Sequence, residues 1–233
     1  NTSPLSLLCQ PMRALILPGI DGTGELLTEF AAALAPDLIA KVVVYPKDAA
    51  LDYAALTALV ADSLPKDGAF VLVAESFSGP IAIQLAARKP EGLIGLVLCA
   101  SFAKAPQSPT LRAFETVLRL ISPNKILIGP AMPWLMGRWS TRDWTRRVRE
   151  AVRSVSAEAM RARLRAVADV DATPLIPQID CPLLYLKASR DRLVGDGGWL
   201  AIRDLSRNAV CIEIEGPHFL LQAKPLECAA AIK

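Results

Sequence analysis

Six short runs of apolar residues, spread along the chain and bounded by turn-forming or polar residues, restrict the fold more than any other feature. Most are continuously apolar rather than alternating, as expected for parallel strands covered on both faces. The runs span residues 13–17, 41–45, 69–74, 94–100, 183–186 and 210–214. Amphipathic helical patterns lie between them, as in residues 52–64. This alternation predicts an α/β fold: a three-layer, doubly wound and mostly parallel sheet of about six strands.

The alternation stops between Phe102 and Cys181. The intervening segment has no strand-like run but three sets of apolar residues at helical spacing. These sets are Leu111, Phe114, Leu118 and Ile121; Trp144, Val148, Val152 and Val155; and Met160, Leu164 and Val167. We therefore expect residues 1–102 and 181–233 to form the α/β core, and residues 103–180 to form a helical insertion over the sheet.

The composition excludes two classes of protein. With 52% hydrophobic and 21% charged residues in a chain of 233, the apolar surface is too large for a disordered chain. The longest apolar stretch, residues 93–103, is far shorter than the roughly 18–20 residues of a membrane-spanning helix, so no membrane span is expected. The first ten residues also lack the charged and apolar regions of a secretory signal.

The cysteines and the histidine content argue against disulfides and metals. The five cysteines are widely spaced, odd in number and without a C-x-x-C pair: Cys9, Cys99, Cys181, Cys211 and Cys228. We therefore expect the cysteines to be free, mostly buried thiols, and the protein to be reduced and cytoplasmic. A chain with one histidine offers few ligands for zinc, and no cofactor is expected.

Positive charge is concentrated in the predicted insertion. Between Arg138 and Arg165 there are nine arginines against three acidic residues, whereas the whole chain has a net charge of +3. A solvated helix face explains this pattern, and so does a docking patch for an anionic substrate or an acidic carrier protein. Nucleic-acid binding is not expected, because the basic segment lacks interleaved aromatic residues suited to stacking.

The segment V-A-E-S-F-S-G-P, residues 73–80, leads from a predicted strand through Ser76 into a predicted helix. A nucleophilic serine at such a strained turn needs small residues two positions before and after it, usually as G-x-S-x-G. Ala74 and Ser78 occupy those positions and are small. An ordinary strand-to-helix turn that contains a serine is the alternative.

The positions of His218 and Asp191 favour the nucleophile. Asp191 follows the fifth apolar run and His218, the sole histidine, follows the sixth, so both are expected at the carboxyl edge of the sheet with Ser76. A serine hydroxyl needs a base within hydrogen-bond reach, and the imidazole needs a carboxylate to fix its tautomer. The sequence therefore predicts a catalytic Ser-His-Asp set.

A glycine-rich loop, L-P-G-I-D-G-T-G at residues 17–24, follows the first predicted strand. It contains neither G-x-G-x-x-G nor a P-loop lysine, which argues against phosphate binding. In a hydrolase such a loop supplies one backbone N–H to the oxyanion, and Phe77, the residue after the serine, supplies the other.

On these motifs, together with S-R-D-R-L-V and G-P-H-F, the chain resembles α/β-hydrolase fold proteins with a helical cap, over nearly its whole length. The resemblance implies that Ser76 is the nucleophile, Asp191 the acid and His218 the base. It also implies that Ile20 and Phe77 donate to the oxyanion.

The sequence departs from that family in three ways. Pro18 stands where the family usually has histidine, Ala74 and Ser78 replace glycines, and the N-terminal antiparallel strands are missing. The last departure predicts a sheet shortened at the N-terminus.

A serine nucleophile, rather than aspartate, argues against epoxide hydrolases and haloalkane dehalogenases. We expect a carboxylesterase for small to medium acyl chains. The apolar cap residues are expected either to line or cover the acyl pocket, with Trp134 and Trp139 binding substrate, or to form the cap's own core; they are Trp134, Leu135, Met136 and Trp139. An esterase or thioesterase for carrier-bound acyl groups, similar to pimeloyl-acyl-carrier-protein methyl esterases, is the alternative. A ligand-binding protein without catalysis is a third hypothesis.

Overall fold

Six parallel strands form one open sheet in the computed structural model, which describes residues 12–106 and 128–233. The strand order is β2-β1-β3-β4-β5-β6, and each neighbouring pair is parallel. The strands are β1 Met12–Leu17, β2 Leu38–Val42, β3 Phe70–Glu75, β4 Leu93–Cys99, β5 Leu183–Arg190 and β6 Ala209–Pro217. The predicted α/β class and strand number are confirmed, and the sheet is fully parallel.

The second strand lies earlier in the chain than predicted. The run at residues 41–45 was expected to be the strand, but β2 pairs Leu38 with Met12 and ends at Val42. Val43 and Tyr45 come directly after the strand, at the carboxyl edge of the sheet, and both are buried there. Tyr45 N donates a hydrogen bond to Gly22 O at 2.8 Å. Pairing with β1, rather than local hydrophobicity, therefore sets the limits of this edge strand.

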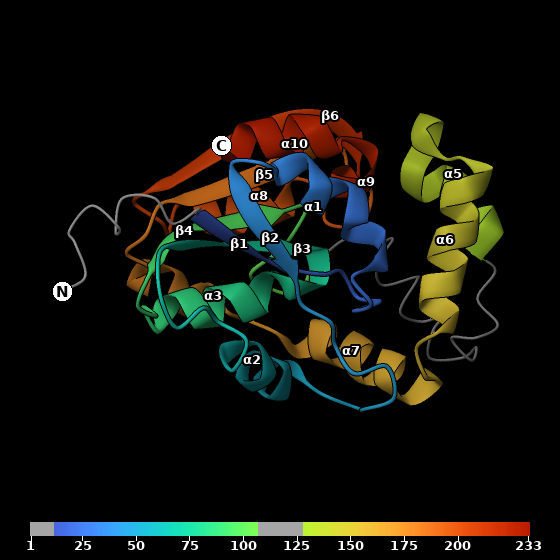
Figure 1. Ribbon diagram of the computed structural model, residues 1–233. Coiled ribbons are helices and arrows are strands. Elements are labelled where there is room, and N and C mark those ends of the chain that lie inside the picture. Colours follow the sequence, from blue (N-terminus) through green and yellow to red (C-terminus); the bar gives the residue numbers. More distant parts are fainter. Residues whose placement is uncertain (1–11, 107–127) are drawn as a thin grey trace.

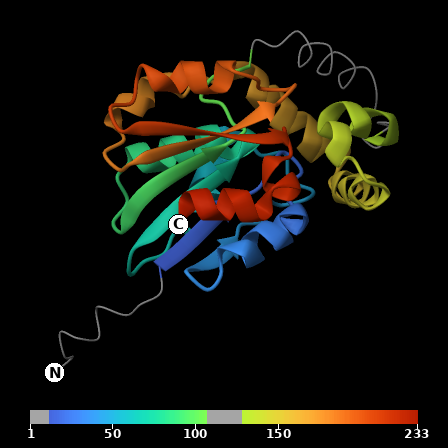
Figure 2. The same cartoon turned by 90° about the horizontal axis from the view of Figure 1, so that it is seen from above.

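Helices cover both faces of the sheet, which makes the predicted three layers (Figure 2). Successive residues of β1 point to opposite faces, so Leu15 and Leu17 belong to one core and Ala14 and Ile16 to the other. The first core packs against α2 Tyr53–Ala61, α3 Gly79–Ala87 and α8 Gly197–Arg203. The second packs against α1 Thr28–Leu34, α9 Leu220–Ala223 and α10 Pro225–Ile232.

Between β4 and β5 the described chain is helical. Its elements are α5 Ile128–Met136, η5 Gly137–Trp139, α6 Arg142–Arg153, α7 Ala157–Asp169 and η6 Thr173–Gln178. Helices α5 and α6 stand beyond the carboxyl ends of the strands (Figure 1). Of the predicted helical faces, Val148, Val155, Met160 and Val167 are buried. The face from Leu111 to Ile121 lies outside the described residues, and the division at residues 103–180 stays a prediction.

Four of the cysteines lie in the described chain, and all four are free thiols. Cys99 and Cys228 are buried, whereas Cys181 and Cys211 are half-buried. Cys9 lies outside the described residues. In the described ranges, no helix combines the length and hydrophobicity that crossing a bilayer requires.

Candidate active site

Ser76 lies at a sharp turn between β3 and α3. Its φ of 46° is in the left-handed region, which a non-glycine residue adopts at a cost that the surrounding structure must offset. Ala74 and Ser78 are fully buried, as close packing of the turn requires. A Cβ at Gly79 would overlap the Ser101 side chain and lie 2.7 Å from Phe102 O. The position that must be glycine is therefore Gly79, one residue later than in the G-x-S-x-G pattern.

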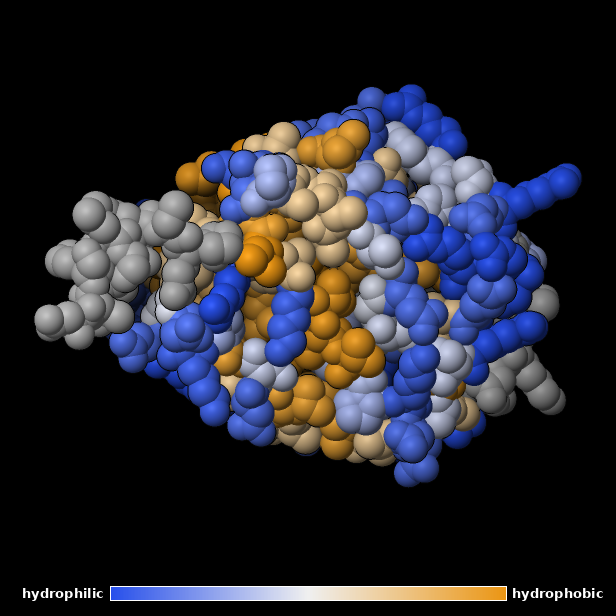
Figure 3. All heavy atoms as spheres, viewed as in Figure 1, coloured by the Kyte–Doolittle hydropathy of each residue, from blue (hydrophilic) through white to orange (hydrophobic). Residues whose placement is uncertain are grey.

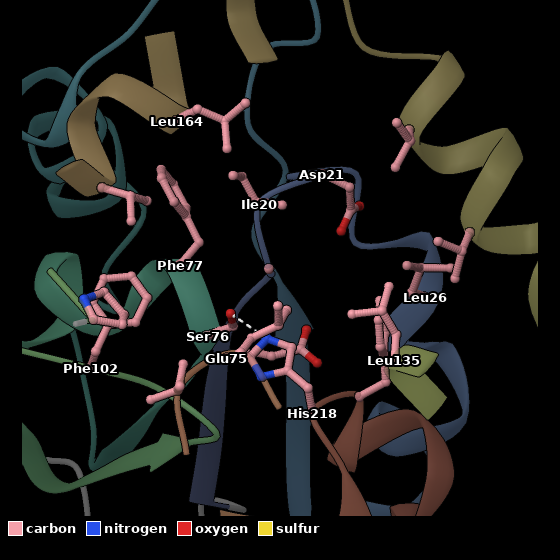
Figure 4. A pocket seen from close by; sticks show the side chains of 18 of the residues that line it. Ile20, Asp21, Leu26, Glu75, Ser76, Phe77, Phe102, Leu135, Leu164 and His218 are labelled. Atoms are coloured by element: carbon pink, nitrogen blue, oxygen red, sulfur yellow. Dashed lines mark hydrogen bonds between the residues drawn. The ribbon is translucent and has the colours of Figure 1, made fainter. Parts of the chain in front are cut away.

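Ser76, His218 and Asp191 form a continuous chain of hydrogen bonds, and Figure 4 shows the bond between Ser76 and His218. Ser76 Oγ lies 2.8 Å from His218 Nε2, and His218 Nδ1 lies 2.9 Å from Asp191 Oδ2. Asp191 directly follows β5 and His218 directly follows β6, as the sequence predicts. Asp191 Oδ1 accepts hydrogen bonds from the backbone N–H groups of Leu193 and Val194 at 2.8 and 3.0 Å, which holds the carboxylate in place.

The electrostatics of these hydrogen-bonded groups suit an imidazole that gains a proton beside a carboxylate that stays ionised. Burial alone would lower the pKa of His218, but the charge and hydrogen bond of Asp191 outweigh it and raise the pKa above 6.5. Burial alone would raise the pKa of Asp191, but His218 and the two backbone N–H groups lower it below 3.8. Asp191 therefore accepts Nδ1–H, and the free electron pair of Nε2 faces Ser76.

The glycine-rich loop after β1 lies beside Ser76. Gly22 N donates to Gly19 O at 3.0 Å, and Gly22 and Gly24 have φ of 67° and 74°. Ile20, in the middle of this turn, lines the same cavity as Ser76 and Phe77. Phe77 lies in the first turn of the helical segment after β3, where backbone N–H groups have no partner within the helix.

Arg163 of α7 lies against this loop. Its Nη1 donates to Ile20 O and Asp21 O at 2.8 and 2.7 Å, and its Nη2 donates to Pro46 O at 2.9 Å. Only 1% of its surface is exposed. For this arginine, the expectation of a solvated face or a docking patch is wrong. Arg163 lies three residues after Met160 and four before Val167, which are both buried, so all three lie on the inner face of α7. This spacing could have predicted that Arg163 is buried.

The cavity at Ser76 has a volume of about 180 Å³ and is mostly apolar. Its walls come from the loop after β1, from the Ser76 turn and from α5, α6 and α7 (Figure 4). Apolar wall residues include Leu26, Leu135, Val148, Val152, Met160 and Leu164. Such a site suits an apolar group bound next to a few polar atoms.

The structure does not bring Trp134 and Trp139 to this cavity. They line a separate depression of about 220 Å³, together with Arg138, Arg190 and Arg192. Arg192 and Arg138 lie over the rings of Trp134 and Trp139 at 5.8 and 4.5 Å from the ring centroids. On α5 it is Leu135, one residue after Trp134, that faces the Ser76 cavity, and Leu135 lines the depression as well.

Sequence reasoning missed Glu75, the residue before Ser76. It is 5% exposed, lines the cavity, and accepts a hydrogen bond from Gln222 Nε2 at 2.8 Å. Burial raises its pKa to about 7, although the bond from Gln222 acts in the opposite direction. A charged residue at the end of an otherwise apolar strand was the available signal. A second carboxylate, Asp21, points into the same cavity (Figure 4).

An open parallel sheet, covered on both faces and with its polar site at the carboxyl edge, defines an α/β protein of the kind that hosts many enzymes. The model of the alpha/beta hydrolase family matches residues 14–231. The chain therefore belongs to the alpha/beta hydrolase family, a family of hydrolases. No match to a curated protein sequence was found.

Solved structures share the fold at low sequence identity. An esterase from Exiguobacterium antarcticum matches with a TM-score of 0.83 and 12% identity, over 95% of this chain and 90% of that chain. An enol-lactonase from Burkholderia xenovorans LB400 matches with a TM-score of 0.76 and 17% identity, over 97% and 91% of the two chains. A thermophilic esterase from Thermogutta terrifontis matches with a TM-score of 0.75 and 20% identity, over 95% and 88%.

Proposed function

We propose that this protein is a serine hydrolase that cleaves carboxylic esters of small to medium acyl chains through an acyl-enzyme at Ser76. The observation that carries the proposal is the hydrogen-bonded chain from Ser76 through His218 to Asp191, which opens into an apolar cavity. The esterases and the lactonase with the same fold support ester chemistry.

In the proposed acylation, Ser76 Oγ attacks the ester carbonyl carbon while its proton passes to His218 Nε2. Asp191 stabilises the resulting imidazolium, and the N–H groups of Ile20 and Phe77 hydrogen-bond to the oxyanion. When the tetrahedral intermediate collapses, the bond to the leaving oxygen breaks, and His218 returns the proton to the alcohol. Water, deprotonated by His218, then attacks the acyl-enzyme and releases the carboxylic acid and Ser76.

The acyl chain occupies the apolar cavity, under the cap formed by α5, α6 and α7. The side chains of Val152, Met160 and Leu164 supply apolar surface from this cap. A volume of about 180 Å³ favours small and medium acyl groups over long chains. Transfer of the acyl chain out of water supplies binding energy of roughly 0.8 kcal/mol per buried methylene.

The test is kcat/KM for p-nitrophenyl esters from acetate to laurate, with Ser76→Ala as the inactive reference. We expect activity that is maximal at a short or medium chain and lost in Ser76→Ala. Ser154→Ala, which changes an exposed serine after α6, should retain wild-type activity. Folded wild-type protein that turns over no ester and does not react with a fluorophosphonate would contradict the proposal and favour the ligand-binding hypothesis.

The alternative substrate is an ester or thioester whose leaving group is an acidic acyl carrier protein. The depression with Arg138, Arg190 and Arg192 adjoins the Ser76 cavity through Leu135, so an anionic leaving group would have cations beside it. Hydrophilic side chains also gather where α5 and α6 form the surface (Figure 3).

The arginines of α6 differ in their availability for such a partner. Arg146 is occupied by Asp143 and Glu150, and Arg147 by Glu29. Among the described residues, Arg142 and Arg149 have no ion-pair partner within 4.0 Å. These two arginines are therefore the best positions for a charge reversal.

Carrier docking predicts that Arg142→Glu with Arg149→Glu raises KM for a carrier-bound acyl substrate and leaves KM for a p-nitrophenyl ester unchanged. Arg207→Glu is the matched control, because Arg207 is exposed and precedes β6 at the opposite edge of the sheet. An equal effect on both substrates would contradict carrier docking.

A further inference from the structure

We propose that Arg163 is a positioning residue that holds the loop of residues 18–22 in the shape required for oxyanion binding. The inference rests on the proposed hydrolase function and deepens it. It assigns a role to a residue of α7 that makes none of the hydrogen bonds of the Ser76–His218–Asp191 chain.

The first argument is the set of hydrogen bonds that Arg163 makes. One guanidinium binds three backbone carbonyls, Ile20 O and Asp21 O in the loop and Pro46 O after β2. All three distances lie between 2.7 and 2.9 Å, which is the range of strong charge-assisted hydrogen bonds. The planar fork of arginine spans two chain segments in this way, whereas a lysine ammonium is a single point charge.

The second argument is burial. Arg163 is the largest fully buried side chain in the described parts of the molecule. Among the described ion pairs, none includes Arg163, and burial lowers the pKa of its guanidinium. Burying a cation is costly, and here the charge of Asp21 and three hydrogen bonds to carbonyl oxygens offset the cost. Two of those carbonyls belong to the loop, so the loop conformation and the buried guanidinium stabilise each other.

The third argument is that the loop is built around the guanidinium. Gly22 has a φ of 67°, and a Cβ on it would lie 2.7 Å from Arg163 Nη1 and 2.9 Å from Tyr45. The Tyr45 ring lies 5.8 Å from the guanidinium carbon and carries its hydroxyl to Ser78 Oγ at 2.7 Å. Arg163 is thus connected to the loop and to the Ser76 turn, the two segments that provide the proposed oxyanion donors.

The geometry explains how a residue of α7 would influence the chemistry. Because the carbonyls of Ile20 and Asp21 are turned toward Arg163, the two peptide planes are fixed and rotation of the loop is restricted. Ile20 and Leu164 lie on the same side of the cavity in Figure 4, and Leu164 belongs to the same helix as Arg163. An acyl chain that packs on α7 therefore contacts the element that holds the oxyanion loop.

The test compares Arg163→Met and Arg163→Lys with Arg161→Met, a control at an exposed position on the same helix. In both Arg163 variants we expect kcat for p-nitrophenyl butyrate to fall about 10- to 100-fold. This decrease does not exceed the one that removal of one oxyanion donor causes, which is about 100- to 1000-fold. KM should change little, because the apolar cavity is unaltered. Affinity for a trifluoromethyl ketone, which forms an oxyanion on Ser76, should fall by the same factor as kcat.

A merely structural role predicts a different result. In that case the Arg163 variants would have a lower thermal unfolding temperature. The kcat of the folded protein and its affinity for the trifluoromethyl ketone would nevertheless equal those of Arg161→Met. This outcome would overturn the inference. If the Arg163 variants do not fold, Gly22→Ala places a methyl group against Nη1 and should reproduce the loss of kcat. Retention of wild-type kcat in folded Gly22→Ala would also overturn it.

Hydrogen exchange separates this inference from the proposed function, because it needs no turnover. Amide exchange in residues 18–24 should be faster in Arg163→Met than in wild type and Arg161→Met. Unchanged exchange in this segment would overturn the positioning role even if the protein is an active esterase. Faster exchange in a protein that is inactive toward every ester would support the positioning role and contradict the proposed function.

Discussion

The hydroxyl of Ser78 donates a hydrogen bond to the carbonyl oxygen of Pro18 and thereby joins the Ser76 turn to the loop after β1. Both residues are departures from the family pattern, one in place of a glycine and one in place of a histidine. Tyr45 completes the contact by hydrogen-bonding to Ser78 Oγ at 2.7 Å. The hydroxyl at position 78 therefore supplies a contact between the turn and the loop that a glycine could not make.

Ser78→Ala should loosen this connection. The substitution leaves the buried Pro18 carbonyl and Tyr45 hydroxyl without a partner, so we expect a loss of unfolding free energy of about 1–3 kcal/mol. We also expect a lower kcat for p-nitrophenyl butyrate, because the turn and the loop separate. Urea denaturation and steady-state kinetics measure the two effects. Wild-type values for both would show that the hydrogen bond is dispensable.

Asp191→Asn should abolish most of the activity without unfolding the protein. The amide oxygen of the asparagine would accept the hydrogen bonds from the backbone N–H groups of Leu193 and Val194, so its NH₂ group would face His218 Nδ1. This NH₂ group favours the tautomer with the proton on Nε2, which cannot accept the Ser76 proton, and we expect kcat to fall about 10⁴-fold. Asp196→Asn, at an exposed aspartate of the same loop, is the control and should remain active. A kcat within about tenfold of wild type would contradict the proposed role of Asp191.

The pH dependence of activity should report His218. Because the protonated imidazole cannot accept the Ser76 proton and its pKa is raised, kcat/KM should increase with pH through a midpoint above 6.5. The chain has one histidine, so its ring proton resonances can be followed without assignment ambiguity. In Asp191→Asn the ring should titrate at lower pH, since the carboxylate that favours the imidazolium is gone. A titration unchanged by the substitution would contradict this account.

Glu75→Gln should alter the pH dependence of stability. A carboxyl group whose pKa rises from 4.5 to about 7 on folding binds a proton that the unfolded chain has lost, so folding becomes less favourable as pH increases through this interval. Above pH 7 the penalty is about 3 kcal/mol, and the glutamine variant should not show it. Asp21 and His218 also face Glu75, so the measurement is the difference between variant and wild type.

Denaturation of wild type, Glu75→Gln and the exposed control Glu91→Gln at pH 5 and pH 8 tests this prediction. The stability difference between Glu75→Gln and wild type should change with pH, whereas that of Glu91→Gln should not. Parallel curves for all three proteins would mean that Glu75 titrates normally in the folded state.

Leu164→Trp should shorten the preferred acyl chain. Leu164 projects from α7 into the cavity, and a larger side chain reduces the volume of about 180 Å³ (Figure 4). The optimum in the p-nitrophenyl ester series should move toward acetate, with kcat for acetate retained. Arg161→Trp adds the same side chain outside the cavity and should leave the optimum unchanged. An unaltered optimum in Leu164→Trp would place the acyl chain elsewhere.

The positions of Ser76, Asp191 and His218 could be predicted because each directly follows a strand. Parallel strands bring their carboxyl ends to one edge, so a local pattern of apolar runs is sufficient to place these three residues together. The bounds of β2 could not be predicted in the same way, because pairing with β1 moved an edge strand three residues toward Leu38.

The residues that surround the hydrogen-bonded set of Ser76, His218 and Asp191 were harder to predict. Trp134 is one residue from Leu135, yet only the rotation of α5 decides which of them faces Ser76. Arginine and glutamate usually lie at the surface, yet Arg163 and Glu75 are buried by elements distant in sequence. In each case, contacts between separate elements set the environment of the side chain.

The sequence by itself determined the α/β class, the six strands and the order of the Ser, Asp and His residues along them, because these follow from local periodicity and from the polarity of a parallel sheet. The tertiary structure decided which side chains form the cavity, which arginine is buried and which carboxyl group has its pKa raised by burial. These properties depend on distances and on exclusion of water between segments far apart in the chain, and no local pattern encodes them.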